Sequence, residues 1–271
     1  MSIQRFLTAI IGLPLIVLML IFANKYVIDA ILMIMALICM DEYFHAIKGI
    51  SNPIKWVGYL STILVFLVAF LDIQTMMIVM IYSVPAVLLI LFLHVILTDM
   101  KINFKDAAYT FLGIFYITYF IVFLSLVTGL KNGKAYLGYG LAAAWGTDVY
   151  AYLAGKYFGK HHFSKVSPKK SIEGCIGGLC GAVIMSLIFV YGATFLTTFE
   201  PIQDKLYLYT AVFAVVLSIV SQIGDFVASS IKRYAEVKDY GNLLPGHGGM
   251  LDRVDSVIFI APLLYILVSL I

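Results

Sequence analysis

The sequence predicts an all-α, polytopic membrane protein with about nine transmembrane spans. Of its 271 residues, 62% are hydrophobic and only 12% are charged, whereas about a quarter of the residues in a soluble globular chain are charged. So few charges cannot cover the surface of a soluble protein of this size. Nine spans of about 20 residues take about 180 positions and leave about 90 for loops, which excludes a separate aqueous domain.

Nine apolar runs are bounded by charged residues or by Gly, Pro and Asn clusters, and each predicts one span. Lipid cannot hydrogen-bond to an open sheet edge, so all nine are expected to be helices. The first run lacks a small-residue cleavage site and is followed at once by another, which favours a retained span over a removed signal peptide. The runs cover residues 6–23, 26–40, 56–71, 76–97, 107–128, 137–153, 175–196, 207–231 and 254–271.

The distribution of Lys and Arg predicts that the N-terminus lies inside and the C-terminus outside. In this orientation the cytoplasmic segments hold 14 of the 18 basic residues, and the outside segments hold four. Basic residues concentrate in cytoplasmic loops. The two richest loops, near 156–174 and 232–249, fall on the same side. We expect residues 1–135 to form a scaffold of helices that also offers dimer contacts, and residues 136–271 to form the catalytic region of a single integrated membrane domain.

Asp225 lies in an otherwise apolar run, 211–230. A charged side chain within a span costs about 2.5–3.5 kcal/mol, so such residues tend to mark function. Ser and Gln in a polar stripe also serve as hydrogen-bonding glue between helices, but a carboxylate that leads to a Lys-Arg pair favours a functional role. At helical spacing the polar face of this run consists of Ser218, Ser221, Gln222, Asp225, Ser229, Lys232 and Arg233.

The last run opens on Asp252 and Asp255, which are three residues apart and should project from one helical face. Two nearby carboxylates repel each other, and a divalent cation relieves the repulsion. Ligands that are all oxygen suit Mg²⁺ rather than zinc, and the three cysteines fit neither a disulfide framework nor a usual zinc site. The alternative is a pair of acids that face solvent at a helix start. Asp148, on one face with Tyr152 and Lys156, would direct a third carboxylate to the same cytoplasmic layer.

Two loop segments are candidates for holding phosphate. The glycines of Pro245-Gly246-His247-Gly248-Gly249 let the backbone approach an anion, and the helix N-terminus that follows adds its positive end. Loops that re-enter a span also need glycines, and a lone His is more often structural. The second segment is Ser167-Pro168-Lys169-Lys170, for which a solvated loop is the alternative. Carboxylates, basic residues and a Gly-rich turn at one membrane face suit phosphoryl or nucleotidyl transfer, whose catalysis is mostly positioning and charge neutralisation.

These residues resemble the CDP-diacylglycerol synthase (phosphatidate cytidylyltransferase) family. The resemblance covers about the last 125 residues, whereas residues 1–135 match only as a run of hydrophobic spans. The chain departs from the family pattern at Ala228, where many bacterial members have Glu, and at Ser171-Ile172, where the upstream block often reads Thr-Trp. The C-terminal signature is read from Ser229, Lys232-Arg233, Lys238-Asp239, Gly241, Leu244-Pro245, His247-Gly248-Gly249, Asp252-Arg253 and Asp255. The upstream block is read from Thr147-Asp148, Ala151-Tyr152, Gly155, Phe158-Gly159-Lys160-His161, Ser167-Pro168-Lys169-Lys170 and Glu173-Gly174.

The resemblance implies that CTP and phosphatidate react to CDP-diacylglycerol and pyrophosphate, with Mg²⁺ and often K⁺ assistance. It also implies a homodimer in the cell (inner) membrane, with the active site at the cytoplasmic face and no nucleic-acid partner. In the expected site the catalytic residues are Asp225, Asp252, Lys232, Arg233 and His247. The metal ligands are expected to be Asp225, Asp252, Asp255 and Ser229. Substrate and phosphate are expected to contact Lys169, Lys170, Ser229, Lys238, Asp239, Gly246, Gly248, Gly249, Arg253 and Asp148.

Two other functions remain open from the residues. A related CTP-dependent polyprenol or dolichol-type lipid kinase could use the same groups. A cation transporter could use Asp148, Asp225 and Asp252 as an ion path, but it would place its acids towards the midplane and carry a pair of broken helices. Three further acidic segments, Asp29, Asp72 and Asp41-Glu42-Tyr43-His45, border predicted spans. They are expected to be loop residues, and no functional role is inferred for them.

Overall fold

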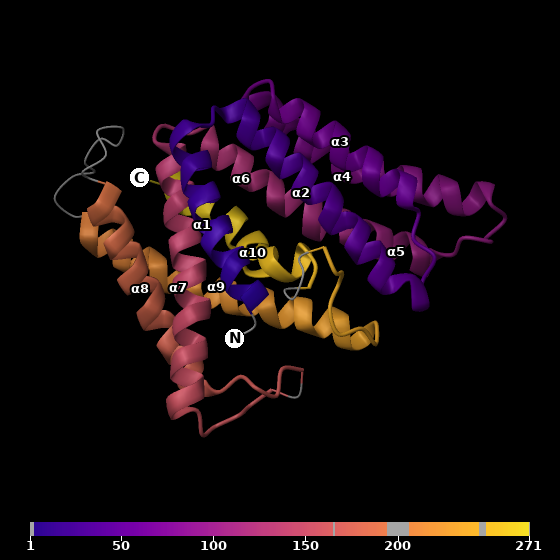
Figure 1. Cartoon of the computed structure of the whole chain (residues 1–271). Helices are drawn as coiled ribbons and strands as arrows, with labels where there is room; N and C mark the ends of the chain where they lie inside the picture. Colours follow the sequence, from indigo (N-terminus) through magenta and orange to yellow (C-terminus); the bar gives the residue numbers. More distant parts are fainter. Residues whose placement is uncertain (1–2, 165, 194–205, 244–247, 271) are drawn as a thin grey trace. The chain divides into compact units, whose positions relative to one another are not determined.

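A computed structural model describes residues 3–164, 166–193, 206–243 and 248–270, without the side chains of 3–11, 13 and 206. The described chain is helical and contains no strand, and His162 and Ser171 form an isolated bridge (Figure 1). Its elements are α1 (Ile3–Phe22), α2 (Lys25–Ala46), η1 (Ile47–Gly49), α3 (Lys55–Ala69), α4 (Ile73–Leu97), α5 (Phe104–Gly113), the π-helical η2 (Ile114–Tyr119), α6 (Phe120–Thr128), α7 (Gly133–Phe158), α8 (Ile172–Ala193), α9 (Leu206–Tyr234) and α10 (Leu251–Ser269).

The all-α prediction is confirmed, because the described part of each of the nine apolar runs falls mainly on a helix or on a continuous helical segment. Among the described residues, four helical segments are long and apolar enough to cross a membrane: Ile73–Leu97, Phe104–Thr128, Ile172–Ala193 and Tyr207–Tyr234. Helices α2 and α10 have comparable lengths but carry several charged residues each. The chain is thus a helical protein with membrane-spanning segments, and the count of nine spans and their orientation stay predictions.

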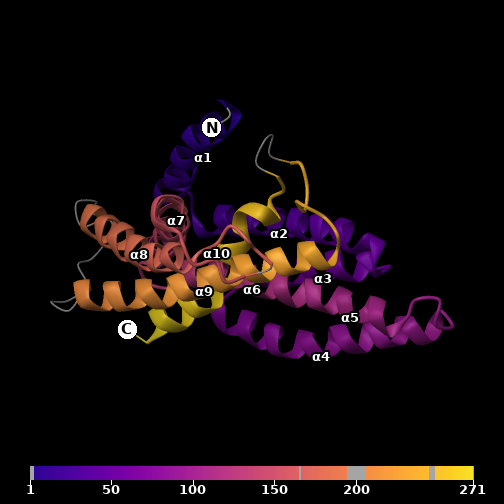
Figure 2. The same ribbon diagram turned by 90° about the horizontal axis from the view of Figure 1, so that it is seen from below.

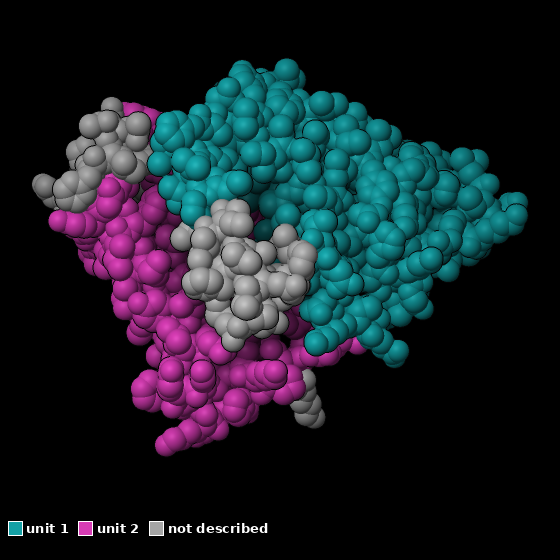
Figure 3. Space-filling model, in the orientation of Figure 1, with its two compact units in different colours: residues 1–129, 234–254 teal, residues 130–233, 255–271 magenta. Residues whose placement is uncertain are grey.

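The chain divides into two compact units (Figure 3). The first comprises residues 1–129 and 234–254, and the second comprises residues 130–233 and 255–271. The first boundary lies close to the predicted division at residue 135. The segment that leads into α10, however, groups with the N-terminal helices rather than with the C-terminal region.

In the first unit, α2 is a largely buried helix that packs against α3, α5 and α6 (Figures 1 and 2). Asp29 is fully buried in α2, where it accepts hydrogen bonds from the Lys25 ammonium and the Ser125 hydroxyl, each at 2.6 Å. The prediction that Asp29 is a loop residue is therefore wrong, and so is the same prediction for residues 41–45, which lie in the last turns of α2. Asp72 does lie outside a helix, as the N-cap of α4.

In the second unit, α7 and α8 pack in close contact along their lengths because small residues face each other. A Cβ on Gly181 would lie 2.3 Å from Tyr150 Cβ and 2.6 Å from the Gly146 carbonyl oxygen, and a Cβ on Gly177 would lie 2.2 Å from Ala154 Cβ. Helix pairs in membranes commonly rely on small residues for such close approach. This contact fixes where α7 and α8 present their polar residues.

We expect Gly181→Ala to lower the stability of the folded protein by about 1–3 kcal/mol, the usual cost of overpacking. The reason is that the added methyl has backbone and Cβ atoms, rather than a flexible side-chain end, in its way. Thermal unfolding in detergent measures the change. Gly192→Ala in the same helix is the matched control, because no atom lies within 4 Å of its added Cβ; equal stability of the two variants would contradict the packing account.

Candidate functional site: two carboxylate clusters

The polar face of α9 has two roles in the second unit. The Thr147 hydroxyl donates to Ser218 Oγ at 2.8 Å, and the Gln222 amide donates to the Cys175 carbonyl at 3.2 Å. Ser218 and Gln222 of α9 therefore bind this helix to α7 and α8 by hydrogen bonds, as the alternative of interhelical glue predicts. The carboxylate further along the same face has a different partner.

Asp225 forms an ion pair with Lys170, which comes from the loop between α7 and α8. The Lys170 ammonium also lies over the Phe226 ring, 4.0 Å from its centroid. Both charged side chains are partly exposed, Lys170 at 24% and Asp225 at 33%. The structure thus joins a residue of the predicted phosphate-holding loop to the carboxylate predicted to bind metal.

The loop that carries Lys170 is held at both ends. The carboxylate of Glu173, in the first turn of α8, accepts the backbone N–H of Lys160 at 3.1 Å and of His161 at 3.2 Å, and its other oxygen contacts His161 Nδ1 at 2.5 Å. The Lys170 N–H donates to the Ser167 carbonyl at 3.1 Å, which closes the turn. The Ser167-to-Lys170 segment is therefore an ordered turn, and the exposed Lys169 lies on it.

Asp255 is a buried carboxylate at the start of α10, exposed by only 7%. Its Oδ1 accepts the backbone N–H of Ser256 at 2.8 Å and the Ser256 hydroxyl at 3.3 Å. The charges of Asp225 and Asp148 are near enough to repel it, and that of Lys232 is near enough to attract it. Three helices of one unit thus bring three carboxylates and a cation into electrostatic range.

The chemistry of this cluster suits Mg²⁺, because its three acidic side chains all offer carboxylate oxygens. Within the described residues, no group of three or more His, Cys, Asp or Glu side chains is placed to hold a single ion. Mg²⁺ is usually held by one or two carboxylates together with substrate phosphates. The cluster matches that mode rather than a cage made of protein ligands alone.

In the first unit, Asp252 binds the loop before α10, of which residues 240–243 and 248–250 are described. One of its oxygens, Oδ2, accepts the backbone N–H of Tyr240 at 2.8 Å and of Gly249 at 3.0 Å. Gly248 has a φ of 81° and a Cβ added there would lie 3.0 Å from the same oxygen, so only glycine fits without strain. Neither Asp252 nor Asp255 is a solvent-facing acid at a helix start.

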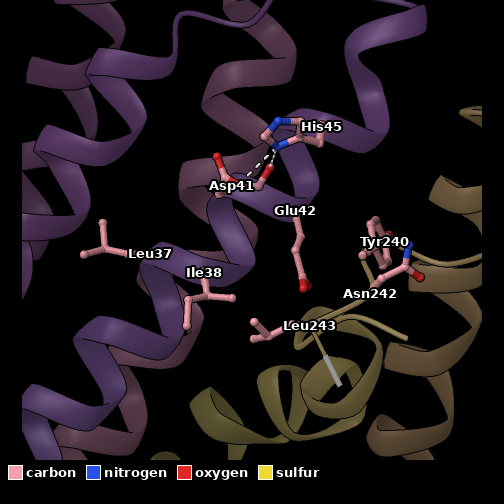
Figure 4. A pocket seen from close by; sticks show the side chains of 9 residues that line it. Leu37, Ile38, Asp41, Glu42, His45, Tyr240, Asn242 and Leu243 are labelled. Atoms are coloured by element: carbon pink, nitrogen blue, oxygen red, sulfur yellow. Dashed lines mark hydrogen bonds and ion pairs between the residues drawn. The ribbon is translucent and has the colours of Figure 1, made fainter. Parts of the chain in front are cut away.

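Glu42, on α2, is a second carboxylate bound to the same loop. It is 8% exposed, and its two oxygens accept the backbone N–H groups of Met250 and Leu251, each at 2.8 Å. Beside it lies a pocket of about 540 Å³ (Figure 4). The pocket is lined by Leu37, Ile38, Asp41, Glu42, His45, Tyr240, Gly241, Asn242 and Leu243.

The other predicted site residues are placed as follows. Arg233 Nε donates to the Val166 carbonyl at 3.4 Å, so the end of α9 reaches the loop that carries Lys170. Ser229 is half-buried on α9, whereas Lys238, Asp239 and Arg253 are exposed in the first unit. Gly246 and His247 lie outside the described residues. Asp225 and Asp252 belong to different units, so their predicted sharing of one metal stays a prediction.

The model of the cytidylyltransferase family matches residues 3–271. This chain belongs to the cytidylyltransferase family. It is 34% identical over 266 residues to a phosphatidate cytidylyltransferase of Staphylococcus aureus (strain COL), which covers 97% of each chain. It is also 37% identical to the Staphylococcus haemolyticus protein of that name, over 68% of each chain, and 36% identical to the Bacillus subtilis one, over 67% of this chain and 65% of the other.

Glu42 is the residue of this cytidylyltransferase-family chain that sequence reasoning missed. A pair of acids, Asp41-Glu42, follows an apolar run directly, and charged residues that continue a span are rare enough to be informative. A loop interpretation of the pair hides that signal. Glu173 belongs to the upstream block, and the structure shows that it orders the loop before α8.

We expect Lys170→Gln to lower kcat/KM for CTP about tenfold. A hydrogen bond to a charged group contributes about 1.5–3 kcal/mol, and partial exposure reduces it. Steady-state kinetics in detergent micelles measures the loss. Lys160→Gln is the control, since Lys160 belongs to the same loop and contacts Glu173 through its backbone N–H alone. An unchanged kcat/KM in Lys170→Gln would show that the Asp225 ion pair does not serve the site.

Proposed function

We propose that this chain is a phosphatidate cytidylyltransferase, which makes CDP-diacylglycerol and pyrophosphate from CTP and phosphatidate. The observation that carries the proposal is the match of curated proteins of that name along 97% of the chain. The carboxylates and basic residues described above support it, because a nucleoside triphosphate brings about four negative charges that cations and backbone N–H groups must compensate. Membrane-spanning helices suit the second substrate, which is a lipid.

In the proposed reaction an oxygen of the phosphatidate phosphate attacks the α-phosphorus of CTP in line. A new phosphoanhydride bond forms while the bond between the α-phosphorus and the oxygen bridging to the β-phosphorus breaks. Pyrophosphate leaves with that electron pair. No protein nucleophile is needed, since the lipid phosphate is itself a charged nucleophile, and the protein contributes positioning and charge neutralisation.

Each residue group has a proposed task in this reaction. Asp225 and Asp255, with Ser229 and Asp252, would hold Mg²⁺, which when bound neutralises phosphate charge. Lys169, Lys170, Lys232 and Arg233 would attract the triphosphate. The backbone of Gly248 and Gly249, just before the N-terminus of α10, would approach the phosphates closely. Asp148, Lys238, Asp239 and Arg253 are proposed substrate contacts, and the pairing of Lys170 with Asp225 supports the first two tasks.

We also propose that the protein spans the cytoplasmic (inner) membrane about nine times as a homodimer, with the N-terminus inside and the active site at the cytoplasmic face. The support is the excess of Lys and Arg in the segments assigned to the cytoplasm, 14 of 18. A site at that boundary can receive cytosolic CTP and membrane-embedded phosphatidate together.

The direct test is to incubate purified protein with α-labelled CTP and phosphatidate in micelles. We expect label in CDP-diacylglycerol and an equal amount of pyrophosphate. Asp225→Asn should lower turnover by at least 100-fold, because it removes a charge that the step requires, while Asp99→Asn, at an exposed loop position, should leave turnover unchanged. Transfer of label from γ-labelled CTP to added dolichol or phytol, with no labelled lipid from α-labelled CTP, would instead identify a lipid kinase.

Metal dependence tests the cofactor. Chelation of divalent cations should abolish turnover, and added Mg²⁺ should restore it. We expect Asp255→Asn to raise the Mg²⁺ concentration for half-maximal rate at least tenfold, because the cluster loses one of its carboxylates. The same Asp99→Asn variant serves as control. Full activity in the presence of chelator would overturn the assignment of Mg²⁺ to these residues.

A further inference from the structure

Glu42 makes a two-pronged contact with the N-terminus of α10. The backbone N–H groups of Met250 and Leu251 lie where a helix start has no internal partners, and Glu42 accepts one with each oxygen at 2.8 Å. A carboxylate at this end is also favoured by the helix dipole. The partners are 208 and 209 residues apart in sequence, so the contact is a feature of the tertiary fold and not a local cap.

Two glycines let the loop pass directly against this carboxylate. A Cβ on Gly249 would lie 2.5 Å from Glu42 Oε2, and a Cβ on Gly241 would lie 2.6 Å from Oε1. Neither position could take a larger residue while Glu42 stays in place. The chain on each side of residues 244–247 thus packs closely against the Glu42 side chain.

Asp252 completes the arrangement. It accepts the N–H groups of Tyr240 and Gly249, while Glu42 accepts those of the next two residues, Met250 and Leu251. Three consecutive backbone N–H groups at the start of α10 are therefore bound by two carboxylates. Loss of Glu42 would leave two of them without this acceptor and would remove the side chain against which Gly241 and Gly249 lie.

The neighbouring acid on α2 does not take part. Asp41 is bound by the Tyr59 hydroxyl at 2.5 Å and by His45 at 3.1 Å, and it is half-exposed. Figure 4 shows the Glu42 side chain pointing away from the Asp41–His45 pair. Both oxygens of Glu42 are occupied by the loop, so Glu42 acts through that loop.

We infer that Glu42 is a positioning residue that sets the conformation of residues 240–243 and 248–250, which flank the start of α10, and of Asp252, and thereby the affinity for the CTP triphosphate. The inference rests on the proposed function. A carboxylate that is buried and neutralised by backbone donors holds the loop in one conformation before the nucleotide arrives, and such preorganisation lowers the cost of binding.

The test compares Glu42→Gln with Asp41→Asn, an equal change of charge on the adjacent residue. Glutamine keeps one acceptor oxygen but turns an NH₂ group towards a backbone N–H. We expect Glu42→Gln to raise the KM for CTP at least tenfold while the KM for phosphatidate changes less than twofold. The stabilisation of the protein by CTP in thermal unfolding should weaken in parallel. Asp41→Asn should match the unsubstituted protein in all three.

The outcomes separate the two claims. If the unsubstituted protein shows no CTP-dependent transfer, the proposed function fails. If it is active and Glu42→Gln keeps its KM for CTP and its CTP-induced stabilisation, the positioning role is overturned while the proposed function stands. If Glu42→Gln lowers the melting temperature but leaves the KM for CTP and the CTP-induced stabilisation unchanged, Glu42 has only a structural role.

A second variant carries the test should Glu42→Gln fail to fold. Gly241→Ala keeps the carboxylate but pushes a methyl against it, because the added Cβ would lie 2.6 Å from Glu42 Oε1. This variant should also raise the KM for CTP at least tenfold, and an unchanged KM for CTP in the folded variant would contradict the positioning role.

Discussion

Every acidic side chain inside this apolar helix bundle needs a donor or a cation, and that requirement organises the structure. An unpaired charge in a low-dielectric environment is costly, and a paired one is tolerated only with good geometry. Asp29 is matched by Lys25 and Ser125, Glu42 and Asp252 by backbone N–H groups, and Asp225 by Lys170. The elements that carry these partners are thereby held to each other within their own units.

The carboxylates of the two units meet this need for a partner in different ways. In the first unit the donors are fixed backbone groups, so the carboxylates of Glu42 and Asp252 define a loop conformation. In the second unit the partner of Asp225 is a lysine at the end of a flexible stem, which can be exchanged for another cation more easily than a backbone group can. A carboxylate with an exchangeable partner is suited to contact ligand, whereas Glu42, whose two oxygens are both bound by backbone N–H groups, is suited to hold shape.

The helical class was predictable because lipid cannot hydrogen-bond to backbone groups, and an apolar run of about 20 residues meets this requirement as a helix. The pairing of Asp225 with Lys170 of the upstream block could be predicted in part, because each is a charged residue in or beside an apolar run. The role of Glu42 was not, because its partners are backbone N–H groups more than 200 residues away and no side-chain pattern marks them. Nor does periodicity reveal that the 234–254 segment groups with the N-terminal helices.

The distance in sequence between Glu42 and the start of α10 has a consequence for biogenesis. During synthesis α2 leaves the ribosome before Met250 and Leu251 have been added to the chain. Until then the Glu42 carboxylate lacks the backbone N–H groups that it binds in the folded protein. A chain halted after α9 lacks them altogether. The proposed CTP site would therefore be completed only after α10 has been made.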